Sequence, residues 1–167
     1  MPLFSSKKTI DTDVLLEQAL AAALGPEAPP ATVRVLTAVA GLLAAVAYAD
    51  RTITPAEQAH LRSELSRLHG FSPERIETVA ELLSSQALKL STTYLPRFTR
   101  TLREELDPQD RCDVLDALLG MAAADGVISH DEVVNLRNLS TALGLSQTHY
   151  NQLQLKYRDK LAGVPKG

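Results

Sequence analysis

Two short stretches of this sequence carry acidic residues at the same spacing. Residues 49–57 read Ala-Asp-Arg-Thr-Ile-Thr-Pro-Ala-Glu, and residues 124–132 read Ala-Asp-Gly-Val-Ile-Ser-His-Asp-Glu. Asp50 and Glu57 of the first stretch correspond to Asp125 and Glu132 of the second. Carboxylate oxygens are the ligands that hard divalent cations prefer. If the fold brings the two stretches together, these four residues are candidates for sharing one divalent cation of unknown identity.

The second stretch has the spacing of the rear half of a calcium-binding EF-hand loop. Asp125, Gly126 and Glu132 would occupy loop positions about 5, 6 and 12. The front half is missing, because its oxygen ligands would have to come from Met121 and Ala123. One stretch therefore supplies too few oxygens for calcium, which takes about six to eight. Arg51 stands where the second stretch has Gly126 and lowers the negative potential of the first, so the second stretch is the better half-site.

The same residues can also be explained without any ligand. Thr54 and Ser129 are typical helix N-caps, and Glu57 and Glu132 follow them at the spacing of a capping box. In that motif the cap side chain and the glutamate each accept a hydrogen bond from the other residue's backbone amide. The sequence leaves both interpretations open, a cation site or helix caps alone.

The acidic stretches belong to a longer internal repeat. Apolar residues match at an offset of 75 residues (Leu43 with Leu118, Ala47 with Ala122, Leu61 with Leu136, Leu68 with Leu143), and Gly70-Phe71-Ser72 matches Gly144-Leu145-Ser146 after a one-residue gap. Each copy predicts a helix, an acidic turn, a capped helix, a glycine stop and another capped helix. Repeat one spans residues 42–87 and repeat two residues 117–161. One copy alone would leave an apolar face uncovered, so we expect the copies to pack together with pseudo-twofold symmetry.

Helical periodicity and Pro or Ser/Thr start signals divide the rest of the chain. We expect two helices over residues 12–24 and about 31–49, and four more that start at Thr54, Ser72, Asp107 and Ser129. A break at 90–96 should precede a short helix around 98–106, and a last helix should run from Ser146 to about Leu161. No segment alternates with the period of a strand. The prediction is an all-α compact bundle of seven to eight helices. Residues 1–30 form an N-terminal helix and Pro-rich linker, 31–161 the helical domain and 162–167 a flexible tail.

Composition excludes several classes of protein. The 167 residues include 17 basic and 20 acidic side chains, so the net charge of −3 gives no field that attracts nucleic acid. The single Cys112 cannot form an internal disulfide, and no signal peptide is apparent, so we expect a cytoplasmic protein. The longest uncharged stretch, residues 35–49, falls short of the roughly 18 residues that span a bilayer, so we expect no transmembrane segment.

Catalytic motifs are also missing from the sequence. The four histidines lack HExxH spacing, and neither GxSxG nor a P-loop occurs. The acidic neighbours of Cys112 should raise the pKa of its thiol and reduce its reactivity. We therefore expect a protein that is not an enzyme.

The pattern Leu-Leu-x-x-x-Ala-x-Ala-Asp-Arg/Gly-x-Ile-Thr/Ser-x-x-Glu, present twice, resembles the TerB tellurite-resistance family and the related N-terminal domain of DjlA-type co-chaperones. The resemblance covers roughly residues 32–161, and residues 119–132 carry the closer match. It implies a bacterial, all-α, non-enzymatic domain of metal or chemical stress responses or phage defence.

The resemblance further implies a divalent cation held by acidic residues, which fall here on Asp50, Glu57, Asp125 and Glu132, and a protein partner near the membrane. Arg51 departs from the family's usual glycine. No His-Pro-Asp motif is present, so the chain cannot act as a J-domain by itself. The alternative function is a metal-free interaction or assembly scaffold in which the acids only cap helices.

Overall fold

Helix α2, Pro30–Ala47, lies at the centre of an all-helical structure. The computed structural model describes residues 12–47, 54–67, 73–124 and 126–161. Five helices pack directly on α2: α1 (Thr12–Leu24), α3 (Pro55–Arg67), α4 (Pro73–Thr92), α5 (Leu95–Glu105) and α6 (Pro108–Ala122). Helices α7 (His130–Ala142) and α8 (Gln147–Leu155) and the 3₁₀ turn η1 (Arg158–Lys160) complete the described chain. The predicted all-α class is confirmed.

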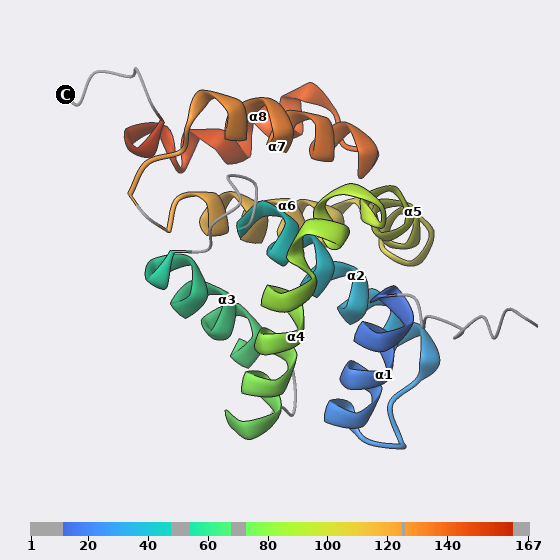
Figure 1. Ribbon diagram of the computed structural model, residues 1–167. Helices are drawn as coiled ribbons and strands as arrows, with labels where there is room; N and C mark the ends of the chain where they lie inside the picture. The colour runs from blue at the N-terminus through green and yellow to red at the C-terminus, as the bar shows by residue number, and fades with distance from the viewer. Residues whose placement is uncertain (1–11, 48–53, 68–72, 125, 162–167) are drawn as a thin grey trace, which may run out of the picture.

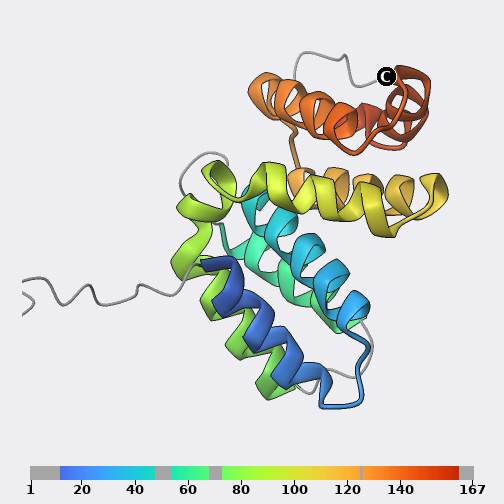
Figure 2. The ribbon, with the colours of Figure 1, turned by 90° about the vertical axis from the view of Figure 1, so that its right-hand side faces the viewer.

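The helices form layers that both ribbon views show. Helices α1 to α4 make the lower part of the molecule, α5 and α6 cross above them, and α7 and α8 cover α6 (Figures 1 and 2). The core is continuous through these layers and consists mainly of Leu and Ala side chains from nearly every helix. The one β-type pairing among the described residues is an isolated parallel bridge between Ile128 and Leu161.

The sequence of α2 explains its central place. Ala, Val and Leu occupy all its faces, and ten of its residues are buried. Within the described residues it is the one helix with the length and composition to cross a membrane, and 61% of it is buried inside the bundle. A core helix has the same length and composition, so this feature is weak evidence for a membrane span.

Helices α2 and α5 approach each other most closely at Gly41. An added Cβ at Gly41 would lie only 2.3 Å from Cε2 of Phe98. Phe98 and Leu102 are buried on the same face of α5 and place the aromatic ring directly over the glycine. The contact between the two helices therefore requires a residue without a side chain at position 41.

Replacing Gly41 with Ala should destabilise the fold by about 1–3 kcal/mol, the usual cost of overpacking a core. Replacing a helical Gly with Ala normally stabilises a protein by about 0.5–1 kcal/mol. A decrease in the free energy of unfolding would therefore indicate the contact with Phe98. Urea unfolding measures the difference. Gly120→Ala in α6 is the matched control, because its Cβ would come no closer than 3.4 Å to other atoms. A Gly41→Ala protein as stable as the control variant would contradict this packing.

The repeat predicted from the sequence appears in the helix boundaries. Helices α3 and α7 have 13 residues each and lie at an offset of 75, and α4 and α8 begin at an offset of 74. Helix α2 of the first copy packs on α6 of the second. The order of helix, turn, capped helix and further helix is thus the same in both copies.

The predicted break at residues 90–96 is wrong in its first part. Helix α4 continues through Leu90 to Thr92, and only Thr93 and Tyr94 separate it from α5. No Pro or Gly precedes Pro96 in this stretch, so nothing stops α4 earlier. Pro96 stands in the first turn of α5, where a missing backbone donor costs nothing.

The last helix is also shorter than predicted, because α8 ends at Leu155 rather than near Leu161. After η1 the chain runs beside the second acidic turn, where the amide of Ile128 donates a hydrogen bond to the carbonyl of Lys160 at 2.7 Å. This long-range pairing, with Ile128 fully buried, replaces the final helical turn. The segment before residue 12 and the tail from residue 162 lie outside the described residues.

Candidate functional site

Both repeated turns end in a complete capping box. In the first, the Glu57 amide donates to Thr54 Oγ1 at 3.1 Å, and the Thr54 amide donates to Glu57 Oε2 at 3.3 Å. In the second, the Glu132 amide donates to Ser129 Oγ at 3.2 Å, and the Ser129 amide donates to Glu132 Oε1 at 3.3 Å. The structural interpretation of these four residues is confirmed, and each glutamate commits one carboxylate oxygen to its cap.

Removing the Ser129 hydroxyl by Ser129→Ala should cost about 1 kcal/mol of unfolding free energy, the usual value of an N-cap. Ser129→Asp supplies another cap acceptor and should remain close to the unsubstituted protein. Urea denaturation compares the two. Equal destabilisation by both substitutions would show that the hydroxyl does not stabilise α7 by capping.

The two aspartates of the predicted cation site, Asp50 and Asp125, lie outside the described residues, as does Arg51. Gly126 follows Asp125 with a φ of +98°, a left-handed conformation that favours glycine. Among the described residues, no three His, Cys, Asp or Glu side chains gather closely enough to hold a metal ion. The predicted cation site, which includes both aspartates, therefore stays a prediction.

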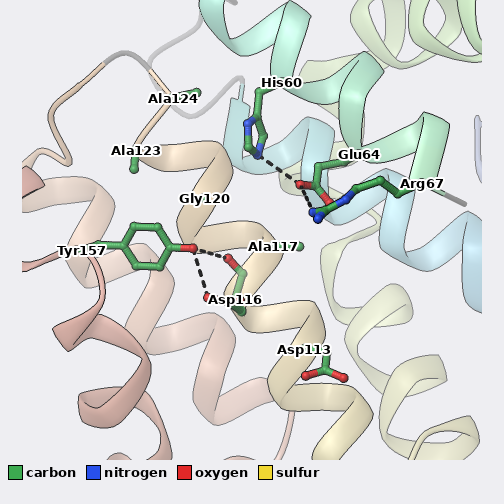
Figure 3. A pocket seen from close by; sticks show the side chains of 10 residues that line it. All are labelled: His60, Glu64, Arg67, Asp113, Asp116, Ala117, Gly120, Ala123, Ala124 and Tyr157. Atoms are coloured by element: carbon green, nitrogen blue, oxygen red, sulfur yellow. Dashed lines mark hydrogen bonds and ion pairs between the residues drawn. The ribbon is translucent and has the colours of Figure 1, made fainter.

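The helices that adjoin the two turns border a common cavity of about 590 Å³. Helix α3 follows the first turn, α6 precedes the second, and the chain beyond α8 closes a further side (Figure 3). The lining residues are His60, Glu64 and Arg67 of α3, Asp113, Asp116, Ala117 and Gly120 of α6, Ala123 and Ala124 after it, and Tyr157. Part of each repeat thus lies against this cavity.

Tyr157 and Asp116 form one wall of the cavity. The phenol oxygen of Tyr157 lies 3.0 Å from Asp116 Oδ1 and 3.2 Å from the Asp116 carbonyl, and it donates toward both (Figure 3). Lys156 reaches the other carboxylate oxygen of Asp116 at 3.3 Å. Burial, followed by the hydrogen bond and charge of Asp116 and the charge of Glu64, raises the pKa of Tyr157 to about 12.

The opposite wall is the polar face of α3. Glu64 Oε1 lies 3.4 Å from His60 Nε2 and 3.4 Å from Arg67 Nη1. The His60 nitrogen is a buried atom, and the contact with Glu64 lacks hydrogen-bond geometry, so Nε2 has no hydrogen-bond partner among the described residues. This wall therefore combines a carboxylate, a guanidinium and an imidazole nitrogen.

The raised pKa of Tyr157 predicts a loss of stability at high pH. The folded state holds the phenol proton up to about pH 12, whereas an unfolded tyrosine releases it near the ordinary value of 10.0. The stabilisation is complete below pH 10.0 and is lost as the pH rises from there toward 12. Denaturant midpoints at about pH 9 and about pH 11 should fall less in Tyr157→Phe than in the unsubstituted protein. An identical fall in both proteins would contradict the assigned pKa.

Sequence reasoning missed this cavity. It treated His60 as an isolated histidine and gave no role to Asp116 or Tyr157. The spacing did contain a partial signal, because His60 and Glu64 are four residues apart and Asp113 and Asp116 three apart, which places each pair on one helix face. Nothing in the sequence indicates that these faces meet, nor that Tyr157 leaves the helix to reach Asp116.

The thiol of Cys112 behaves as the sequence predicted. Burial and then the charge of Asp113 raise its pKa, and Arg111 opposes this only in part. The thiol is free and half-buried. A raised pKa lowers the fraction of reactive thiolate at neutral pH, so Cys112 is poorly suited to act as a nucleophile.

Comparison with known proteins agrees with the repeated motif and the helical fold. The family model described as tellurite resistance protein TerB matches residues 36–155, which is most of the chain. This chain therefore belongs to the TerB family, whose members are generally non-catalytic. No curated protein and no solved structure matches it.

Proposed function

We propose that this TerB-family chain is a non-catalytic, cytoplasmic binding module of the response to tellurite, metals or chemical stress. In this proposal the module holds a divalent cation at Asp50, Glu57, Asp125 and Glu132 and presents helical surfaces to a protein partner near the membrane. The observation that carries the proposal is the duplicated acidic turn, whose capping box recurs with the same bonds in both copies.

Capping and cation binding are compatible uses of the same glutamates. A carboxylate has two oxygens with about four lone-pair sites, so it can accept from a cap amide and from other partners at the same time. The capping boxes also fix where α3 and α7 begin. The shared cavity of α3 and α6 supports bringing the two turns near each other.

Exposed apolar side chains support a partner surface on the second repeat. Of the four large hydrophobic residues exposed among the described residues, Val127, Val134 and Leu155 belong to this repeat, and Leu155 is 67% exposed. Val134 lies on α7 and Leu155 at the end of α8, the outer helices of the bundle (Figure 1). Burial of such side chains by a partner would be favourable.

Calorimetric titration of the metal-free protein with Ca²⁺, Mg²⁺, Mn²⁺ and Zn²⁺ tests the cation site. We expect saturable binding of at least one ion. The free energy of unfolding should increase by about 2.7 kcal/mol when the ion concentration is a hundred times its Kd. The double variant Asp50→Asn, Asp125→Asn should lose this response. The control Glu81→Gln, Glu104→Gln removes the same charge at exposed positions of α4 and α5 and should keep it.

The capping boxes account for Glu57 and Glu132 without any cation, which leaves a metal-free interaction or assembly scaffold as the alternative function. In that case the glutamates only stabilise the starts of α3 and α7. Unchanged melting temperatures and no heat of binding at about millimolar metal would establish the alternative and remove the cation site from the proposal.

A further inference from the structure

The cavity between α3, α6 and Tyr157 has the dimensions of a ligand site. Its volume of about 590 Å³ lies within the range of about 300–1,000 Å³ that is usual for small-molecule pockets. Its walls come from three separate segments of the chain and include an imidazole, a guanidinium, a phenol and three carboxylates (Figure 3). Convergent polar groups in a concave site are the usual mark of a binding pocket.

Gly120 keeps this cavity open. An added Cβ would lie 3.4 Å from both His60 Nε2 and the phenol oxygen of Tyr157, so a side chain would project into the space between the two walls. Glycine within a helix costs about 0.5–1 kcal/mol relative to alanine. No closer atom excludes a methyl group here, in contrast to Gly41 under Phe98. Gly120 therefore weakens α6 and leaves the cavity unfilled, although alanine would fit at this position.

The charge of the cavity favours a cation. Glu64, Asp113 and Asp116 line it, Arg67 pairs with Glu64, and Lys156 pairs with Asp116, so the carboxylates outnumber the cationic groups. The field of Asp116 and Glu64 contributes to the raised pKa of Tyr157, as expected where negative charge predominates. A cationic group entering the cavity would reduce the repulsion among these negatively charged carboxylates.

The arrangement of acceptors favours an organic cation over a bare metal ion. These carboxylates and His60 do not form a set of three that could reach one metal ion. A metal requires ligands at about 2.0–2.6 Å, whereas an ammonium group accepts partners at about 2.7–3.2 Å along three separate N–H directions. Carboxylates that do not meet around one metal ion can therefore still contact an ammonium group from different directions. The buried and unbonded Nε2 of His60 offers a further polar contact.

We propose that the cavity lined by His60, Glu64, Asp116, Gly120 and Tyr157 binds an alkylammonium group, carried by a free amine or by a lysine side chain. The carboxylates of Glu64 and Asp116 hold the charge, and the space over Gly120 takes the alkyl chain. This site is separate from the acidic residues of the proposed cation site and does not depend on them.

Titration followed by amide chemical shifts tests the proposal with three probes. We expect 1,4-diaminobutane, Nα-acetyl-lysine methylamide, or both to give saturable shifts around Gly120 and Tyr157. The uncharged 1,4-butanediol has a similar size and should give none. Binding of the diamine alone assigns the site to free amines, and binding of the lysine derivative assigns it to a protein side chain. The proposal is overturned if neither amine gives saturable shifts up to about 10 mM. That result would mean a binding free energy weaker than about −2.7 kcal/mol.

Variants then show whether the shifts arise in this cavity. Gly120→Leu should abolish binding by filling the space, and Gly120→Ala should weaken it while leaving the melting temperature unchanged or higher. Glu64→Gln, Asp116→Asn should weaken binding at least about tenfold, whereas the control Glu81→Gln, Glu104→Gln should not. The proposal is overturned if a folded Gly120→Ala protein and the Glu64→Gln, Asp116→Asn variant both bind the amine with full affinity. The binding site would then lie elsewhere.

Discussion

The structure depends on the burial of one apolar helix. Helix α2 contacts five other helices, so its removal from water contributes to almost every packing interface of the lower layers. The density of this packing follows from its small residues, since Ala and Gly41 allow neighbouring helices to approach closely. The ring of Phe98 occupies the space that a side chain at position 41 would need. The position of α5, which also contacts α7, depends on this contact, whereas α6 packs on α2 directly.

Duplication gives the molecule two equivalent capped helix starts with different surroundings. In both, a Thr or Ser hydroxyl and a Glu carboxylate satisfy amides that a helix start leaves unpaired. The second turn is also tied by Ile128 to the end of the chain, which ends α8 early and directs Tyr157 toward α6. A capping motif that stabilises a helix thus also helps to shape one side of a polar cavity.

Four acidic residues of this protein fall into two groups with distinct physical roles. Glu57 and Glu132 lie beside backbone amides at helix starts, where a carboxylate is favoured by hydrogen bonds and by the helix dipole. Glu64 and Asp116 instead face a cavity between helices, where their charges act on Tyr157 and on whatever enters.

The helices and their starts could be predicted from local sequence, because Pro55, Pro108, Thr54, Ser129 and the glycine stops act through local backbone chemistry. The sequence also determined the repeat and the capping glutamates, whose partners lie three residues away. Tertiary contacts were needed to end α8 at Leu155 and to bring His60, Asp116 and Tyr157 to one cavity. These features arise from contacts between residues far apart in the chain, and such contacts leave no periodic signal in a single sequence.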